Sequence, residues 1–241
     1  MQFYFIRHGQ STNNRLYAQA GSRQERSPDP ELTEVGQQQA HYVADFLYRD
    51  DGVSVEEDAY DPQNVHRFGI THLYTSLMVR AVATGAVIAR ALGLPLLGWK
   101  DLHETGGMFL EDAETGDLIG QPGETRAYFT AHYPDLVLPE SVTENGWWNR
   151  SFEPYEERPA RAQRVLQDLM GRHGGTDHRV AVVSHGGFFN HLLMAILNMP
   201  EEGAPWFLIN NTAITRVDFN AEGTTVVYVN RADFLPRTLL T

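Results

Sequence analysis

Residues 2–9, QFYFIRHG, join a short apolar and aromatic run to an Arg-His-Gly tripeptide. An apolar run that charge stops this abruptly predicts a buried β-strand over Gln2–Ile6. The stretch 179–187, RVAVVSHGG, repeats the arrangement and predicts a second buried strand over Arg179–Ser184, of the kind found in parallel sheets. A charged or imidazole side chain therefore follows each strand directly.

Strands alternate with helical patterns over the rest of the chain. We expect helices over about 32–48, 76–92, 156–172 and 187–197, and further strands over 70–75, 96–99, 213–219 and 224–230. The alternation predicts the α/β class, as a three-layer α/β/α sandwich with a mostly parallel central sheet. The stretch up to about Pro30 and the acidic stretch Asp50–Arg67 lack periodicity, so we interpret both as loops.

Side-chain chemistry predicts further helix features. Thr33 and Ser76 are residue types favoured at N-caps, and each lies where a helix is expected to begin. Pro159 suits the first turn of the helix that starts near Glu156. That helix is expected to turn four apolar residues to the core and two arginines to solvent, namely Val165, Leu166, Leu169 and Met170, and Arg161 and Arg164.

The pattern becomes irregular between Glu104 and Tyr155, where several glycines, prolines and aromatic residues occur. We therefore expect a single domain over 1–241 with an inserted lobe at about 104–155 that sets substrate specificity. Trp147 and Trp148 are expected in a small satellite core of this lobe. The alternative is that the aromatic residues form the wall of a substrate pocket.

Composition excludes several classes of function. The 31 acidic and 19 basic residues give a formal net charge of -12, which argues against nucleic acid and anionic membrane partners. The absence of cysteine excludes disulfides and thiolate chemistry. No stretch nears the roughly 20 apolar residues of a membrane span, so we expect a cytoplasmic protein. A homodimer is compatible with the sequence, which does not determine the oligomeric state.

Charged groups follow the predicted strands at three places, Arg7-His8-Gly9, Ser76 with Arg80, and His185-Gly186. The carboxyl ends of parallel strands meet at the edge where ligands bind, so these groups are expected to converge. Two guanidiniums, two imidazoles and helix N-termini together predict a phosphate site. The glycines Gly9 and Gly186 would let the backbone approach the anion.

Histidine spacing does not indicate a metal site. Neither His66 with His72 nor His185 with His191 has the i, i+4 spacing of paired ligands on a helix. We therefore expect neither a metal ion nor another cofactor.

Five motifs occur in a defined order: RHGQST at 7–12 with Asn14, LTEVG at 32–36, Ser76 with Arg80, Glu104, and SHGG at 184–187. Together they resemble the phosphatase branch of the histidine phosphatase superfamily, also called phosphoglycerate mutase-like. The resemblance implies a central sheet flanked by helices and a phosphohistidine intermediate.

The resemblance also implies roles for individual residues. His8 would be the nucleophile, with Arg7, Arg80 and His185 holding the transferring phosphoryl oxygens. Glu104 would protonate the leaving oxygen. Ser11 and Asn14 would make secondary contacts with the substrate, as would Ser76, Gly9 and Gly186. Four nearby acids remain alternatives to Glu104, namely Glu111, Asp112, Glu114 and Glu124.

The expected activity is a metal-independent phosphomonoesterase acting on a small phosphorylated metabolite. Glycolytic mutases of the superfamily have Glu-Arg-x-Tyr-Gly where residues 104–108 read ETGGM, which disfavours the alternative of a phosphoglycerate mutase-like phosphotransferase. A non-catalytic protein that binds a phosphorylated ligand is the third hypothesis. Arg126 and Arg150, the few bases of the lobe, indicate a monophosphate and not a polyanion.

Overall fold

The computed structural model describes residues 1–20, 26–49, 61–200 and 202–241. Its centre is a seven-stranded sheet with the strand order β6-β3-β2-β7-β1-β8-β9. The strands are β1 (Gln2–Arg7), β2 (His72–Thr75), β3 (Leu96–Gly98), β6 (Leu136–Val137), β7 (Arg179–Ser184), β8 (Ile214–Asn220) and β9 (Gly223–Arg231). The five from β6 to β1 are parallel, and β8 and β9 close the sheet antiparallel. The predicted α/β class with a mostly parallel sheet is confirmed.

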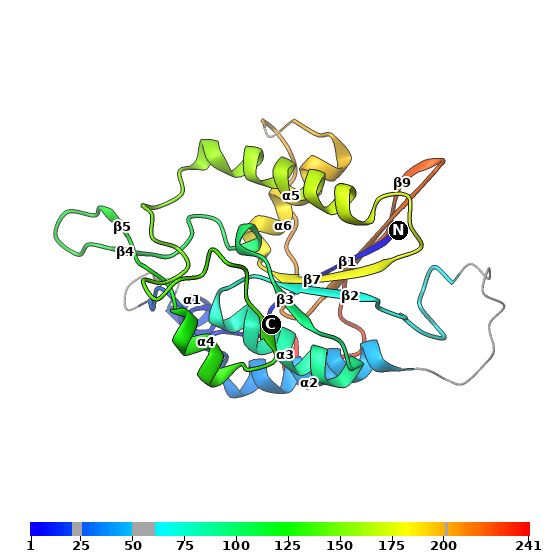
Figure 1. Cartoon of the computed structure of the whole chain (residues 1–241), viewed down its shortest axis with the longest axis horizontal. Helices are drawn as coiled ribbons and strands as arrows, with labels where there is room; N and C mark the ends of the chain where they lie inside the picture. Colours follow the sequence, from blue (N-terminus) through cyan, green and yellow to red (C-terminus); the bar gives the residue numbers. More distant parts are fainter. Residues whose placement is uncertain (21–25, 50–60, 201) are drawn as a thin grey trace.

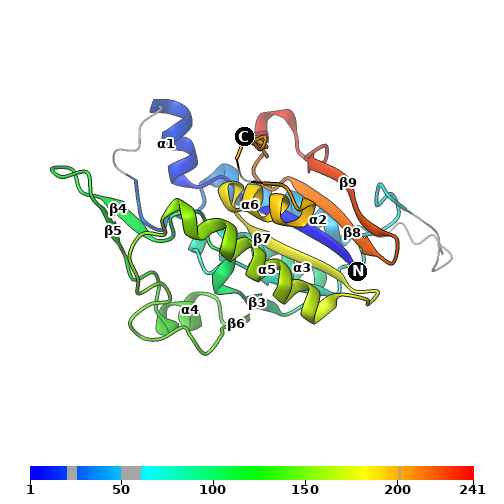
Figure 2. The ribbon, with the colours of Figure 1, turned by 90° about the horizontal axis from the view of Figure 1, so that it is seen from above.

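Helices cover both faces of this sheet (Figure 1). The helices α2 (Glu34–Tyr48) and α3 (Val79–Leu92) lie on one face, and α5 (Arg158–His173) and α6 (Gly186–Leu197) lie on the other. Figure 2, seen from above, shows α5 and α6 lying over the strands of the sheet. Within the described ranges, no helix is long and apolar enough to span a bilayer.

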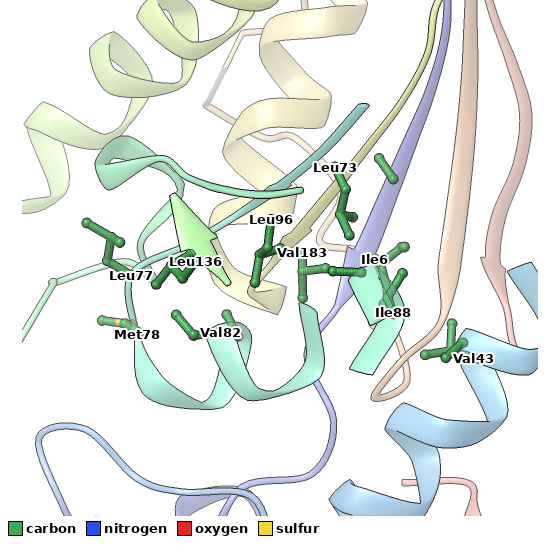
Figure 3. Close-up of a cluster of buried hydrophobic side chains, with 14 of the residues drawn as sticks. Ile6, Val43, Leu73, Leu77, Met78, Val82, Ile88, Leu96, Leu136 and Val183 are labelled. Carbon is green, nitrogen blue, oxygen red and sulfur yellow. The ribbon is translucent and has the colours of Figure 1, made fainter. Parts of the chain in front are cut away.

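Each face of the sheet has its own buried core, because side chains alternate along a strand. In β1, Tyr4 and Ile6 pack toward α2 and α3, whereas Phe3 and Phe5 pack toward α5 and α6. Figure 3 shows the first core, where Ile6 lies near apolar side chains of β2, β3, β7 and α3. Burial of both faces explains why β1 and β7 are apolar without interruption.

The helix α1 (Thr12–Ala20) lies in a stretch that we interpreted as a loop, so that prediction is wrong. The sequence of α1 is largely polar and has no apolar stripe, which removed the periodic signal. Ser11 supplies the start instead, because its hydroxyl accepts a hydrogen bond from the Asn14 N–H at 3.3 Å. In the other predicted loop, residues 50–60 lie outside the described residues.

The predicted inserted lobe contributes to the main sheet. It contains a two-stranded ribbon of β4 (Phe109–Glu111) and β5 (Leu118–Gly120), then α4 (Arg126–His132), then β6, which pairs with β3. Trp147 and Trp148 are buried in the same hydrophobic core as the side chains with which α2 and α3 cover one face of the sheet. The prediction of a satellite core is therefore wrong, because β6 attaches this part of the lobe to the edge of the sheet.

One of the two predicted N-caps is confirmed. The Thr33 hydroxyl accepts the Gly36 N–H at 3.1 Å and caps α2. Ser76 does not cap α3, which begins three residues later at Val79. The Val79 N–H instead donates to Asp29 Oδ1 at 3.0 Å, a partner 50 residues away that no local pattern could indicate.

The helix α5 departs from its predicted orientation at two positions. Val165 and Leu169 are buried as expected, and Arg164 is exposed. Met170, however, is 37% exposed, and Arg161 is only 2% exposed. The turn of the helix that was expected to face solvent at Arg161 instead packs against the end of the lobe.

Candidate active site

The carboxyl ends of β1 and β7 bring two histidines together. These strands pair in parallel with Arg7 opposite Ser184, so His8 and His185 follow them side by side. Their ring centroids lie 5.0 Å apart. Arg80, in the first turn of α3, completes the group, since its Nε lies 3.1 Å from His8 Nε2. The convergence expected of these residues is therefore present.

The hydrogen bonds of His8 indicate which ring nitrogen is free. Nδ1 lies 2.6 Å from the Gly9 carbonyl, which can only accept, so Nδ1 carries the proton. Nε2 then holds the lone pair and accepts from Arg80 Nε. Burial, and next the charges of Arg80 and Arg7, lower the pKa of His8 well below its ordinary value. The ring is thus neutral at physiological pH, the form that can attack phosphorus.

His185 is held in the same tautomer, with its proton on Nδ1. Its Nε2 lies 2.8 Å from the Ser76 hydroxyl, which itself accepts the Met78 N–H at 3.3 Å. The hydroxyl is therefore available to donate to Nε2, which leaves a proton on Nδ1. Burial, followed by the charge of Arg80, lowers the pKa of His185 well below its ordinary value. Ser76 is thus a positioning residue for His185, and its hydroxyl is taken by this contact.

Three buried donors in this group have no hydrogen-bond partner in the described residues: Arg7 Nε, Arg80 Nη1 and His185 Nδ1. Arg7 is fixed at its other end, where Nη1 donates to the Ile209 carbonyl at 2.6 Å. Buried donors without partners are rare, because each costs about 1–3 kcal/mol. Their sharing one site with a neutral His8 fits a tetrahedral oxyanion, whose oxygens would supply the missing acceptors.

Glu104 lies at the start of α6, beside this group. Its carboxylate accepts the Gly187 N–H at 3.1 Å and the Phe188 N–H at 2.9 Å, and also the Thr105 N–H at 2.8 Å. Its charge acts on both Arg7 and Arg80. The absence of a side chain at Gly187 is required here, because a Cβ would lie 2.5 Å from Glu104 Oε1.

A pocket of about 910 Å³ leads to the site. Arg80, which contacts His8, and Glu104 both line it, so the pocket reaches within one side chain of the nucleophile. The other polar and charged residues of its lining are Asn13, Arg26, Ser27, Thr105, Glu111, Asp112 and Arg158. Phe109 and Phe152 form an apolar part of the wall. The alternative interpretation of the lobe aromatics as a pocket wall thus holds for these two and not for the tryptophans.

The predicted secondary contacts fare differently. The Gly9 N–H donates to Thr84 Oγ1 at 3.0 Å, so in this structure it is not free to donate to an anion. A glycine is needed there because a Cβ would lie 2.5 Å from the Gly36 carbonyl oxygen.

Ser11 and Asn14 bond to each other at 3.1 Å and do not line the pocket, whereas Asn13 does. Gly186 lies against Arg7, where an added Cβ would meet Nε at an ordinary 3.5 Å. Close approach to the anion is thus not shown for this glycine.

The geometry agrees with the comparisons with known proteins. The model of the histidine phosphatase superfamily (branch 1) matches residues 3–55 and 62–232. The chain belongs to this superfamily. Its members act on phosphate esters as phosphatases or mutases. The resemblance predicted from the motifs is confirmed.

Individual members of the superfamily resemble the chain over nearly its whole length. The Probable phosphoglycerate mutase GpmB of Yersinia pestis is 27% identical over 222 residues, which cover 91% of this chain and 85% of the relative. Phosphoserine phosphatase of Entamoeba histolytica, solved with 3-phosphoglyceric acid, has a TM-score of 0.61 and 19% identity, covering 98% of this chain and 99% of that chain. A mycobacterial glucosyl-3-phosphoglycerate phosphatase has a TM-score of 0.61 and 20% identity, with 96% and 99% covered. The two structures show the shared fold.

The sequence analysis did not predict the roles of two residues that support this histidine phosphatase site. The first is Arg161, whose Nη1 donates to the carbonyls of Asp101 and His103 at 2.8 and 2.9 Å. Its Nε and Nη2 bind Glu153 at 2.6 and 2.8 Å, and Glu153 in turn accepts the Gly106 N–H. Arg161 therefore holds the chain on both sides of Glu104, directly at Asp101 and His103 and, through Glu153, at Gly106.

The second missed residue is Asp29. Its side chain is only 6% exposed and lies 3.7 Å from Arg80 Nη1. Burial raises the pKa of Asp29 to about 7. The Pro-Asp-Pro sequence at 28–30 gave no sign of this role, since the contact to α3 depends on tertiary structure.

Proposed function

We propose that the protein is a phosphomonoesterase that forms a phosphohistidine on His8. The observation that carries the proposal is the neutral His8, whose Nε2 lone pair lies among buried donors of Arg7, Arg80 and His185 that have no hydrogen-bond partner in the described part of the chain. A scaffold that only bound phosphate would need the donors but not a nucleophile held in its reactive tautomer. Because the site combines these donors with such a nucleophile, it favours catalysis over binding alone.

The first step forms the bond between His8 Nε2 and phosphorus and breaks the bond from phosphorus to the ester oxygen. Glu104 in its protonated form would give its proton to that oxygen, so that an alcohol leaves. The guanidiniums of Arg7 and Arg80 would offset the charge on the three phosphoryl oxygens, and the Nδ1–H of His185 would donate a hydrogen bond to one of them.

The second step is hydrolysis of the phosphohistidine. Water attacks phosphorus, Glu104 accepts a proton from the water, and the P–N bond breaks to return His8 to its neutral form. Inorganic phosphate leaves with the oxygen of the water. The proposed reaction is balanced without a metal ion, so turnover is expected in EDTA.

The pocket supports a small monoester as the substrate. Arg126 and Arg150, the few bases from which we predicted a monophosphate, do not line the pocket: Arg126 is bound to the Val142 and Pro139 carbonyls, and Arg150 pairs with Glu157. The lining outside the histidine site has Arg26 and Arg158 against Glu111 and Asp112, so its charge is balanced. A balanced wall does not favour a polyanion. The solved relatives named above are phosphatases of small phosphorylated metabolites.

The mutase alternative follows from the name of the Yersinia relative. A mutase returns the phosphoryl group to a second hydroxyl of the substrate and must keep water from the phosphohistidine. The ETGGM sequence at 104–108 differs from the mutase motif, and this difference favours hydrolysis.

The test is hydrolysis of para-nitrophenyl phosphate in EDTA by the wild type, His8→Ala and His41→Ala. His41 is an exposed histidine of α2 and serves as the matched control. We expect His41→Ala to match the wild type and His8→Ala to lose at least about 10³-fold in kcat, the scale of losing a covalent nucleophile. Rapid acid-free quenching followed by ³¹P NMR should detect phosphohistidine in the wild type and in His41→Ala but not in His8→Ala.

Other outcomes separate the hypotheses. Conversion of 3-phosphoglycerate to its 2-isomer with little phosphate release would identify a mutase. Phosphate binding without turnover of any monoester, with no trapped phosphohistidine, would identify a binding protein and would refute the catalytic proposal.

A further inference from the structure

Three histidines meet at the end of the sheet opposite His8. His72 is the first residue of β2, His173 is the last residue of α5, and His178 immediately precedes β7. In Figure 1, the end of α5 and the beginnings of β2 and β7 lie toward the N-terminus of the chain, away from the β4–β5 ribbon. At about 3.3 Å per residue, the strand β7 alone separates this cluster from His185 by roughly 20 Å.

The distances within this cluster, hereafter the histidine triad, suit a metal ion. One ring nitrogen of each histidine lies within 4.8 Å of the others. His173 Nδ1 and His178 Nδ1 are 2.9 Å apart. A tetrahedral zinc ion with Zn–N bonds of about 2.0–2.1 Å places its ligand nitrogens roughly 3.3 Å apart. Small rotations of the rings would therefore complete the coordination.

Outer hydrogen bonds already orient two of the rings. His173 Nε2 lies 3.0 Å from the buried Tyr74 hydroxyl, which can accept its proton and leave the Nδ1 lone pair toward His178. His72 Nδ1 lies 2.8 Å from Thr71 Oγ1, whose own proton goes to the Arg179 carbonyl. Nδ1 of His72 is therefore the donor, and Nε2 is left as a ligand. Partners of this kind fix the tautomer of ligating histidines.

The framework of the triad is rigid and accessible. β2 pairs in parallel with β7, with His72 opposite Val180, so two of the ligands are set by sheet hydrogen bonds. His173 is buried, whereas His72 and His178 are partly exposed, which leaves a path for the ion.

We propose that His72, His173 and His178 form a binding site for a divalent transition metal of the zinc type, separate from the catalytic centre. Imidazole ligands suit zinc, copper and nickel, whereas magnesium and calcium prefer oxygen ligands. Three protein ligands leave one position for water. A bound ion joins the end of α5 to the sheet, and because it binds only the folded chain it raises the stability of the fold.

The test is calorimetric titration of Zn²⁺ alone into EDTA-stripped, dialysed protein. We expect one ion per wild-type chain and the same affinity in the control His41→Ala. His72→Ala and His178→Ala should each lose more than about 100-fold in affinity, beyond the 10–100-fold typical of losing an outer partner. Tyr74→Phe, which removes only such a partner, should lose about 10–100-fold. Co²⁺ should give the intense visible absorption of a tetrahedral site in the wild type and in His41→Ala, but not in His72→Ala or His178→Ala.

Two further results would overturn the proposal. One is Zn²⁺ binding that survives in His72→Ala and His178→Ala but is lost in His8→Ala, because the ion would then occupy the catalytic histidines. The other is the absence of any saturable binding in a wild type that melts cooperatively. Thermal melts of every variant in EDTA check folding, and Zn²⁺ should raise the Tm of the wild type and of His8→Ala but not of His72→Ala.

Discussion

The buried pair of Arg161 and Glu153 allows a quantitative prediction. Arg161→Met keeps the length of the side chain but removes its charge and donors. In the native protein both side chains are almost fully buried, at 2% and 1% exposure, and are joined by hydrogen bonds of 2.6 and 2.8 Å. Two further bonds hold the Asp101 and His103 carbonyls. The substitution leaves a carboxylate and two carbonyls buried without these partners.

The expected loss of stability follows from the uncompensated charge. Breaking a buried ion pair by removing one partner costs about 3–5 kcal/mol. For a chain of this size, 1 kcal/mol lowers Tm by about 2–4 °C, so Arg161→Met should melt roughly 6–20 °C below the wild type. Adding Glu153→Gln to Arg161→Met removes the buried charge while keeping an acceptor for the Gly106 N–H. The double variant should therefore be more stable than the single variant.

Activity should fall together with stability, because Arg161 anchors the segment that carries Glu104. A displacement of a catalytic group by about 1 Å can cost about 10²-fold in rate. We expect this loss in kcat with poor leaving groups, which need the acid most, and a smaller loss with para-nitrophenyl phosphate. Arg164→Met, an exposed arginine on the same helix, is the matched control and should change neither quantity. An Arg161→Met variant that melts within 2 °C of the wild type, with unchanged kcat, would refute the reasoning.

Four further substitutions test other parts of the structure. Gly187→Ala should displace Glu104, since its Cβ would lie 2.5 Å from Oε1, and should lower kcat while phosphohistidine still forms. In Gly171→Ala the added Cβ meets nothing within 4 Å. This variant should instead stabilise the protein by about 0.5–1 kcal/mol in urea melts. Ser76→Ala removes one hydrogen bond to the second histidine and should lower kcat/KM by about 10-fold in steady-state assays, with no effect contradicting its positioning role. Burial raises the pKa of Asp29 to about 7 from an unfolded value of 3.8, so the folded chain binds the extra proton and loses stability as pH rises from 4 to 7. Urea melts of Asp29→Asn should lack this component, and a wild type that gains stability relative to it over that range would contradict the assignment.

The strands that carry the site could be predicted because their burial has a local signature. β7 lies at the predicted Arg179–Ser184, and β1 extends the predicted Gln2–Ile6 by one residue. Buried parallel strands are apolar on both faces, so a run of a few residues suffices. The helix α1 was missed for the opposite reason, since its polar sequence has no stripe to detect.

The buried polar residues could not be predicted in the same way. In the sequence Arg161 looks like any solvated arginine on a helix, and only the fold brings its partner Glu153 beside it. In the sequence Asp29 looks like an ordinary loop acid, and only the fold brings the N–H of Val79, at the start of α3, to its carboxylate. A charged residue is buried only when its partner compensates it, and the partner is chosen by the fold.

The histidine triad illustrates the same limit. Our expectation of no metal site considered pairs by their spacing along a helix. His72 and His173 are 101 residues apart in sequence, and they meet because β2 lies beside β7 in the sheet. Spacing rules detect ligands on one element and not ligands that sheet order assembles.

The sequence by itself determined the α/β class, the superfamily and the strand ends at which Arg7, His8 and His185 lie, because these depend on local runs of residues. Only the tertiary structure decided which nitrogen of His8 is free, which groups hold Glu104, and what surrounds the pocket. Those properties depend on contacts between residues far apart in the sequence, such as Arg80 with His8, 72 positions apart, and the Phe188 N–H with Glu104, 84 positions apart. Such contacts exist only after the strands have taken their order.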